Sequence, residues 1–359
     1  MRQKVYLNGR FLTRSLSGVQ RSAFELVTAL DELIERKKVN ADNISFILIY
    51  SGDIINPICL KHIQLLKRGI FKGNLWEQLE LPIYTAGSLL ISMCSISTIF
   101  KSKQIVVVHD ASFFVNKDYF SFSFRTWYKF AIPFIAKMSR RTVTVSDFSK
   151  NELVKYGNLD EQKISVIYNA ADHILRYETP DKVFIDKINS FKPYCLSVSN
   201  LGANKNYKGL SKAISKINFA NKHMLIAGGE MSGLKSETPD KNVTYLGYVT
   251  NNELKYLYLN ASLFIFPSFY EGFGIPPLEA MMAGCPVIAS NTSSLPEILA
   301  DACAYFDPAD PNDMASKIDS LINDNERLGI LKSKGYQRSA MYNWEKSGLQ
   351  FYNLMYQYL

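Results

Sequence analysis

The chain has 359 residues, of which 47% are hydrophobic and 21% are charged. This length is too great for one ordinary hydrophobic core and fits two domains of about 150 to 200 residues. The composition excludes an intrinsically disordered chain. The five cysteines are scattered, odd in number and without a Cys-x-x-Cys pair, which argues against a disulfide framework and against a zinc site. We therefore expect two globular domains in which most cysteines are buried as small hydrophobic residues.

The net charge of +8 lies entirely in the first half of the chain. Residues 1–180 contain 24 Lys and Arg against 16 Asp and Glu, whereas residues 181–359 contain 17 of each kind. A basic half suggests an anionic partner, such as phospholipid head groups or a phosphorylated acceptor, although solubility alone explains it equally well. A nucleic-acid partner is not expected, because this half contains no recognisable RNA- or DNA-binding module.

Neither a signal peptide nor a membrane span is expected. The N-terminus reads as a strand, and no stretch reaches the ~20 apolar residues that a spanning helix needs. We expect a cytoplasmic protein, for which a peripheral contact with the inner face of the cytoplasmic membrane stays open.

The predicted elements of the first half alternate between strand and helix. An opening strand over 4–9 and a loop precede an amphipathic helix over 20–35, whose apolar positions recur at helical spacing. Further strands are predicted over 44–50, 89–93, 104–108 and 141–145. Such alternation predicts a mostly parallel sheet covered by helices.

The second half repeats this pattern. Strands are predicted over 194–198, 223–227, 243–246, 263–266 and 287–290, with helices over 207–217, 251–259 and 277–283 between them. We expect an α/β protein with two Rossmann-like doubly wound domains, spanning 1–175 and 176–340, that face a cleft. The last segment, 341–359, is expected to form a helix that packs back on the N-terminal domain. Ligands of such sheets bind at the carboxyl ends of the strands.

The segment Tyr270 to Pro286, YEGFGIPPLEAMMAGCP, carries the densest group of candidate site residues. Its glycines, Gly272 and Gly274, let the backbone approach a ligand closely, and the helix that follows presents N–H groups suited to an anion. Glu271 and Glu279 stand eight residues apart and suit the paired hydroxyls of a sugar or ribose. Taken singly, each glutamate fits a plain structural role at least as well, as a solvated loop charge or a partner of the helix dipole.

The longer string YEGFGIPPLEAMMAGCPVIASNTSSLPEI resembles the Glu-x7-Glu region of retaining glycosyltransferases of the GT-B fold, family 4. The resemblance implies that Glu271 lies beside the donor sugar and that Glu279 binds the nucleotide ribose. It also implies that the backbone of residues 272–275, namely Gly272, Phe273, Gly274 and Ile275, lies by the sugar and phosphates.

A second resemblance lies in SVSNLGANKNYKGL, which looks like the strand and loop of this family that end in Lys-Asn. It implies that Lys205, beside Asn206, clamps the donor diphosphate, and a lysine ammonium stabilises the charge that develops on such a leaving group. Many relatives have an arginine where this chain has Ser199. Lys208 and Arg21 are the only substitutes that we can suggest for it.

The first half contributes weaker signals. RSLSGVQRSAFEL resembles the glycine loop after the first strand of the family, which implies that Gly18 lies near the donor phosphates and leaves Arg21 as a candidate on the acceptor side. By the same resemblance, His109 faces the donor sugar and Asp110 lies near the acceptor, although a histidine at a strand end is as often a satisfied polar residue. NGRFLTRSLSGVQRSAFEL, LWEQLELP and VVVHDASFF look like a bacterial subgroup that builds surface polysaccharides.

The resemblance implies a retaining glycosyltransferase with Lys205, Glu271 and His109 as its catalytic residues. The donor would be a nucleoside diphosphate sugar, with GDP-mannose or another GDP-hexose favoured over a UDP-sugar. The acceptor would be a lipid-linked oligosaccharide of O-antigen or exopolysaccharide synthesis. No metal and no cofactor is expected, because no Asp-x-Asp motif is apparent. Two alternatives stay open: another enzyme of the same fold, either a nucleotide-sugar epimerase or a glycan phosphorylase, and a non-catalytic protein that binds sugar nucleotides.

Overall fold

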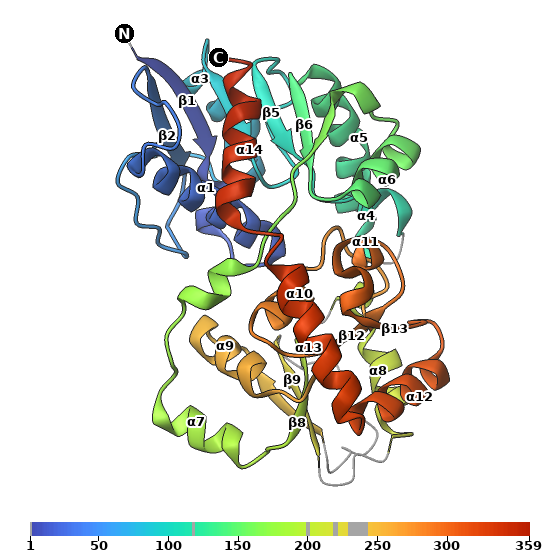
Figure 1. The fold of residues 1–359 in the computed structure, drawn as a ribbon. Coiled ribbons are helices and arrows are strands. Elements are labelled where there is room, and N and C mark those ends of the chain that lie inside the picture. Colours follow the sequence, from blue (N-terminus) through green and yellow to red (C-terminus); the bar gives the residue numbers. More distant parts are fainter. Residues whose placement is uncertain (1, 117–118, 199–201, 218–221, 229–242) are drawn as a thin grey trace. The chain divides into compact units, whose positions relative to one another are not determined.

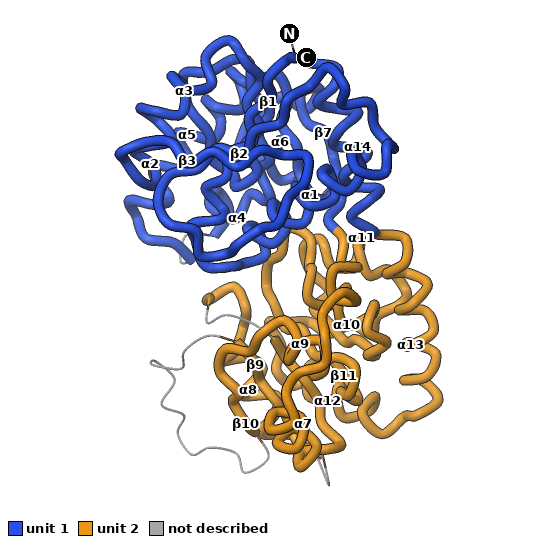
Figure 2. The backbone as a smooth tube through the Cα atoms, turned by 90° about the vertical axis from the view of Figure 1, so that its left-hand side faces the viewer, with its two compact units in different colours: residues 1–169, 343–359 blue, residues 170–342 orange. Residues whose placement is uncertain are grey.

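The computed structural model describes residues 2–116, 119–198, 202–217, 222–228 and 243–359. They form two compact units, coloured separately in Figure 2. The first contains residues 1–169 and 343–359, and the second contains residues 170–342. The chain therefore leaves the first unit after Asn169 and returns to it at Asn343, where the sequence placed these boundaries after 175 and after 340.

The first unit is built on a seven-stranded sheet in which every pairing is parallel (Figure 1). Its order is β3-β2-β1-β4-β5-β6-β7. The strands are β1 (Gln3–Asn8), β2 (Ile44–Tyr50), β3 (Gln64–Lys67), β4 (Leu89–Ser92), β5 (Gln104–Val107), β6 (Arg141–Thr144) and β7 (Ile164–Val166). The central strands are buried along their length, as parallel sheets covered on both faces require.

Helices cover both faces of this sheet, as Figure 2 shows. On one face lie α1 (Gly18–Glu35) and α14 (Trp344–Tyr356), which share a core with β1, β2, β4 and β5. A Cβ added at Gly348 would lie 3.1 Å from the Cβ of Ala29, so the last helix of the chain packs closely on α1. On the other face lie α2 (Gly73–Leu75), the π-helical turn η2 (Trp76–Glu80), α3 (Leu81–Tyr84) and α5 (Phe122–Met138).

Shorter elements complete the first unit. They are the 3-10 helices η1 (Gly9–Thr13) and η4 (Glu161–Lys163) and the α-helices α4 (Ser112–Val115) and α6 (Asp147–Gly157). The hydroxyl of Ser146 caps α6 by accepting a hydrogen bond from the N–H of Ser149 at 3.0 Å.

The second unit contains a six-stranded parallel sheet of order β10-β9-β8-β11-β12-β13. Its strands are β8 (Tyr194–Val198), β9 (His223–Ala227), β10 (Val243–Gly247), β11 (Leu263–Phe266), β12 (Val287–Ser290) and β13 (Ala304–Phe306). Its helices are α7 (Lys182–Asn189), α8 (Tyr207–Ile214), α9 (Asn251–Asn260), α10 (Ile275–Met282), α11 (Leu295–Leu299), α12 (Pro311–Ile322) and α13 (Asn325–Ser339), with the 3-10 helices η5 (Asp172–Arg176), η6 (Ala203–Lys205) and η7 (Ala300–Ala302).

The two parallel sheets confirm the predicted fold class, with one doubly wound sheet in each unit. Strands β3, β7 and β13, of three or four residues each, were not predicted. In each sheet the strand order reverses once, between β1 and β4 in the first unit and between β8 and β11 in the second. Ligands of open α/β sheets bind at such reversals, beside the carboxyl ends of the strands. Among the described residues, no helix is long and apolar enough to span a membrane.

Candidate active site

An ion pair joins the carboxyl ends of the two strands at the reversal of the second sheet. Lys205 ends the 3-10 helix that follows β8, and Glu271 follows the neighbouring strand β11. The Lys205 Nζ lies 2.5 Å from the Glu271 Oε1, and both side chains are mostly buried. The ammonium also lies 5.8 Å from the centre of the Phe266 ring, where a cation is attracted by the π face. The structure thus brings two of the predicted catalytic residues into direct contact.

Backbone contacts from two other segments hold the loop of Glu271 in place. The Glu271 N–H donates to the Oγ of Ser293 at 3.1 Å, and the Glu271 carbonyl accepts from the Oγ of Ser294 at 3.0 Å. On the side of η6, the N–H of Phe269 donates to the carbonyl of Asn204 at 2.8 Å. The loops after β8, β11 and β12 therefore brace one another at the end of the sheet. Such support keeps a site in one geometry.

The helix α10 begins at Gly274, which is held in a left-handed conformation with φ 92°. A Cβ at this position would lie 2.7 Å from the Cδ2 of Leu295, so both the dihedral and the packing require glycine. Pro276 and Pro277 follow in the first turn and have no N–H group, which suits the start of a helix. The amides that this terminus can present to a ligand therefore come chiefly from residues 272–275, including Gly272, Phe273 and Ile275.

Glu279, the second glutamate of the Glu-x7-Glu region, has a different environment. Glu279 lies on α10 and is almost completely buried, as are its two partners, His173 of η5 and Tyr258 of α9. The His173 Nε2 lies 2.8 Å from the Glu279 Oε1, and the hydroxyl of Tyr258 donates to Oε2 at 3.1 Å. Both carboxylate oxygens are thus held by side chains from other elements. The sequence patterns identified neither His173 nor Tyr258, because an isolated histidine or tyrosine carries no spacing signal.

Asn206, predicted to bind the donor, is engaged within the fold. It has a φ of 57° and is buried between η6 and α8. Its Oδ1 accepts from the N–H of Gly209 at 3.2 Å and so caps α8, while its Nδ2 donates to the carbonyl of Pro308 at 2.7 Å. These contacts fix the turn that presents Lys205. Ser199, the position of the missing arginine, lies outside the described residues.

Gly18 and Arg21 lie in the first unit, at the start of α1 after β1, on one side of the reversal between β1 and β4. Gly18 is exposed, and a Cβ there would meet no atom within 4 Å. Arg21 has a mostly buried side chain, with an Nη1 3.8 Å from the Oε1 of Glu25 one turn further along α1. Its guanidinium is therefore held against α1 by a carboxylate of the same helix.

His109 and Asp110 follow β5 in the first unit. The His109 Nε2 lies 2.8 Å from the carbonyl oxygen of Met93, which follows β4, so this nitrogen carries the proton in the neutral ring. Burial lowers the pKa of His109, and the hydrogen bond to Met93 and the charge of Asp110 oppose that shift. The imidazole is therefore neutral at pH 7. Asp110 accepts from the N–H of Ser112 at 2.8 Å, which supports the start of α4.

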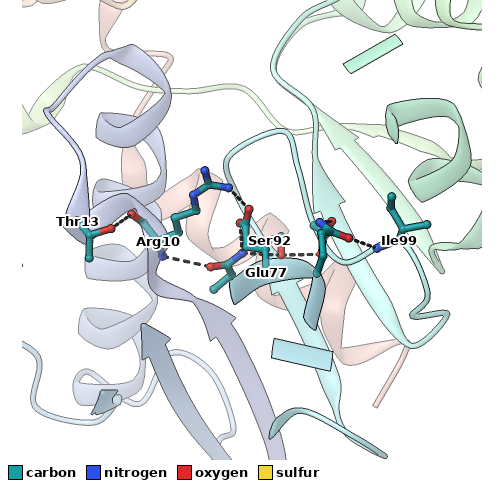
Figure 3. A network of polar contacts seen from close by, with 8 residues as sticks. Arg10, Thr13, Glu77, Ser92 and Ile99 are labelled. Atoms are coloured by element: carbon teal, nitrogen blue, oxygen red, sulfur yellow. Dashed lines mark hydrogen bonds and ion pairs between the residues drawn. The ribbon is translucent and has the colours of Figure 1, made fainter. Parts of the chain in front are cut away.

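A buried polar network that the sequence did not reveal lies beside the reversal between β1 and β4 (Figure 3). The Nδ2 of Asn8, the last residue of β1, donates to the Oε1 of Glu77 at 2.8 Å and to the Oγ of Ser92 at 3.2 Å. Arg10 pairs with the other oxygen of Glu77. Burial is the main cause that lowers the pKa of Arg10, to about 10, so it stays charged at pH 7. Together these contacts link η2 to the ends of β1 and β4.

No group of three or more His, Cys, Asp or Glu side chains suited to a metal ion occurs among the residues that the structure describes. The cysteines agree with the expectation from the sequence, since Cys195, Cys285 and Cys303 are buried and Cys94 is partly buried. Only Cys59, of the five, is exposed.

Comparisons with known proteins identify the fold of the chain and the family that its second unit matches. The family model "Glycosyl transferases group 1" matches residues 178–338, which is nearly all of the second unit. The chain is 28% identical over 326 residues to the O-antigen chain mannosyltransferase RfbU of Salmonella typhimurium, with 86% of this chain and 88% of that protein covered. It is also 28% identical over 264 residues to O-antigen chain mannosyltransferase B of Escherichia coli, with 70% and 69% covered.

Residues 178–338 thus match the group 1 glycosyl transferases, and the chain has the GT-B fold. Solved structures of low sequence identity share this fold over the whole length. Sucrose-phosphate synthase of Thermosynechococcus elongatus superposes with a TM-score of 0.73 at 18% identity, and 99% of each chain is covered. WaaG, a glycosyltransferase involved in lipopolysaccharide biosynthesis, superposes with a TM-score of 0.69 at 13% identity, with 98% of this chain and 99% of that chain covered.

Proposed function

We propose that this protein is a glycosyltransferase that transfers mannose, or another hexose, from a GDP-sugar to a hydroxyl of a lipid-linked oligosaccharide, with retention of configuration at the anomeric carbon. The observation that carries the proposal is the contact between Lys205 and Glu271 at the reversal of the second sheet, beside the start of α10. A cation and a helix N-terminus suit a diphosphate, and an adjoining carboxylate suits sugar hydroxyls. The mannosyltransferases of Salmonella and E. coli that the chain is similar to support the sugar.

The reaction assigns distinct tasks to these groups. The bond between the anomeric carbon and the diphosphate oxygen breaks, and the acceptor oxygen forms its bond to that carbon from the same face. The acceptor proton passes to the leaving diphosphate. Lys205 and the amides of residues 272–275 stabilise the negative charge that develops on the leaving group, and in many enzymes such stabilisation contributes more to catalysis than any other effect. Glu271 and the neutral His109 orient the sugar, and Glu279 binds the ribose.

Replacing Lys205 with Ala tests this assignment. Removal of one preorganised charge-stabilising group lowers turnover by about 10²- to 10³-fold in other enzymes, and we expect a loss of that order. Lys212→Ala is the matched control, because Lys212 is an exposed lysine of the neighbouring helix α8 to which no role in donor binding is assigned. The readout is nucleotide release from donor plus acceptor, with thermal unfolding as a check of the fold. Normal turnover in a folded Lys205→Ala protein would overturn the proposal.

The nucleotide base and the sugar require a separate experiment. A thermal-shift screen of GDP-mannose, GDP and the corresponding UDP compounds is expected to show stabilisation by the GDP series. Stabilisation by UDP-sugars alone would favour the alternative donor. Support for that alternative comes from the structure of HepE of Anabaena with UDP-glucose, which superposes with a TM-score of 0.69 at 15% identity and covers 99% of this chain and 100% of that chain. Incubation with donor alone separates the two other candidates: an epimerase alters the sugar without acceptor, and a silent binding protein releases no nucleotide.

We also propose that the enzyme works at the inner face of the cytoplasmic membrane, where it contacts the bilayer peripherally through its basic first half. The excess of basic side chains in residues 1–180 supports this placement, as does the lipid-linked acceptor that the proposed reaction uses.

A further inference from the structure

One face of the first unit exposes large apolar side chains that are not part of its core. We define the apolar face as Leu75, Leu79, Ile83, Phe100, Phe130 and Phe134. Ile83, Phe100 and Phe130 are 71%, 84% and 63% exposed, which is unusual for side chains of this size. Contiguous apolar surface of this kind marks a contact with another molecule or with a membrane.

Three segments that are separate in the sequence meet on this face. Leu75, Leu79 and Ile83 follow at intervals of four residues along α2, η2 and α3, so they line one side of that helical stretch. Its opposite side is already used, because Trp76 and Leu81 are buried against the sheet. The exposed leucine and isoleucine side chains are therefore additional to a complete core.

Hydrogen bonds and ring contacts connect this helical stretch to α5. The Nε2 of Gln78 donates to the carbonyl of Ser97 at 3.0 Å, and the N–H of Ile99 donates to the Oε1 of Gln78 at 3.0 Å, which anchors the turn before Phe100 (Figure 3). The rings of Phe100 and Phe134 lie 6.2 Å apart, and those of Phe130 and Phe134 lie 6.4 Å apart. Figure 2 shows α2, α3 and α5 on the same side of the strands, opposite α14.

The stretch of sequence that contains the apolar face is strongly basic. Residues 64–141, which contain the whole face, have eleven Lys and Arg against four Asp and Glu, or +7 of the net +8 of the chain. One of the four acids, Glu77, is buried in its pair with Arg10. A groove of about 660 Å³ beside Phe130 and Phe134 is lined by three lysines and one acid, namely Lys129, Lys137, Lys163 and Asp160. Lys137 and Arg140, at the end of α5, are exposed.

This combination of charge and apolar surface points to one kind of partner. We infer that the apolar face and its basic surroundings dock on an anionic lipid bilayer, with the aromatic and aliphatic side chains at the level of the acyl boundary and the cations at the phosphate groups. Amphipathic surfaces bind membranes by burying apolar area while basic residues attract anionic lipid. A second copy of the chain fits less well, because a two-fold contact would oppose one basic face to another.

Binding to lipid vesicles tests the inference with the full-length protein and without donor. The wild type is expected to cosediment with vesicles of phosphatidylglycerol and phosphatidylcholine, and far less with vesicles of phosphatidylcholine alone. The triple variant Leu79→Ser, Ile83→Ser, Phe100→Ser should bind at least about tenfold more weakly, since each buried side chain of this size contributes substantially to insertion. The matched control is Val183→Ser, Ile330→Ser, Tyr356→Ser, which removes similar exposed side chains elsewhere and should bind like the wild type.

The charges are tested separately. Lys137→Gln with Arg140→Gln should weaken binding to the anionic vesicles by about fivefold for each charge removed, because one basic residue near such a surface contributes about that factor. Lys182→Gln with Lys332→Gln, which changes two exposed lysines of the second unit, should have no effect. Thermal unfolding should be unchanged in all these variants.

Three outcomes would overturn the inference: equal binding of wild type and triple variant, binding that does not depend on anionic lipid, or a wild-type dimer that the triple variant converts to monomers without any vesicle binding. The inference rests on the proposed function only for the location of the acceptor. Vesicle binding without sugar transfer would refute the proposed function and support the docking surface. Sugar transfer to a soluble acceptor by a protein that does not bind vesicles would refute the docking surface and support transfer activity.

Discussion

Replacement of Tyr258 by Phe tests how Glu279, the second glutamate of the Glu-x7-Glu region, is held. The substitution removes one hydroxyl, whose oxygen lies 3.1 Å from the Glu279 Oε2, and keeps the ring in its buried position between α9 and the sheet. The ring contact with Phe264, at 5.3 Å between centroids, should survive. The change therefore isolates the hydrogen bond from the packing.

The expected loss of stability follows from the kind of hydrogen bond that is removed. Bonds to charged groups contribute about 1.5–3 kcal/mol, because a buried carboxylate oxygen that loses its donor keeps its desolvation cost. For a unit of this size, 1 kcal/mol lowers Tm by about 2–4 °C, so Tm of the second unit should fall by about 3–12 °C. If Glu279 binds the donor ribose, the donor KM should also rise while kcat changes little, because the lost interaction is formed equally in the ground and transition states.

Tyr194→Phe is the matched control. Tyr194 is also completely buried, and its hydroxyl donates at 2.9 Å to a neutral acceptor, the carbonyl of Leu257. This variant should lose about 1 kcal/mol and leave the donor KM unchanged. Scanning calorimetry and steady-state kinetics with a GDP-sugar and its 2′-deoxyribose analogue provide the readouts. An unchanged Tm in Tyr258→Phe would refute the role of this hydroxyl, and an equal rise of KM for both donors would refute the link through the ribose.

Two further predictions concern the glycines and His109. Gly274→Ala should destabilise the second unit by about 1–3 kcal/mol, since a φ of 92° and a Cβ 2.7 Å from Leu295 both oppose alanine. Gly18→Ala should leave stability unchanged and weaken donor binding, because a Cβ there meets no atom within 4 Å. Urea unfolding measures the stability and the donor KM measures the binding, and full activity of the Gly18→Ala protein would remove Gly18 from the site. Because burial lowers the pKa of His109 below its unfolded value of 6.5, the folded protein binds fewer protons there, so stability should be level above about pH 6.5 and decrease as the pH falls below it. The His109→Asn protein should show a shallower decrease in urea midpoints between pH 6.5 and 5, and identical slopes in the two proteins would contradict this assignment.

The regular elements were predictable because their patterns are local. Strands β2, β8, β9, β11 and β12 have the bounds that the sequence predicted, since short apolar runs between turn residues are read directly from the chain. Strand β3 was missed because Gln64–Lys67 lies at the edge of its sheet and is largely exposed, so its side chains carry no apolar pattern. Strand β13 was missed because it is only three residues long, and such segments take their conformation from the neighbouring strand.

The contacts within the site were less accessible to sequence reasoning. Lys205 and Glu271 were each identified by motif, but their pairing depends on β8 and β11 being neighbours, which is a property of the sheet order. His173 is 106 residues from its partner Glu279, so only the tertiary fold brings these two side chains together. Asn206 shows the opposite case, since its motif suggested a ligand contact while both ends of its side-chain amide hold the backbone.

The two glutamates of the Glu-x7-Glu region illustrate how the fold gives two residues of one type different environments. Glu271 stands in a loop, and its partner is the flexible chain of Lys205, so an anionic ligand that attracts the ammonium also changes what the carboxylate contacts. Glu279 stands on a helix, and its partners are a rigid imidazole and a rigid phenol that are both buried. The first carboxylate can therefore respond to the charge of a bound diphosphate, whereas the second keeps one position. This division suits the proposed reaction, in which the charge near the sugar changes and the ribose is left untouched.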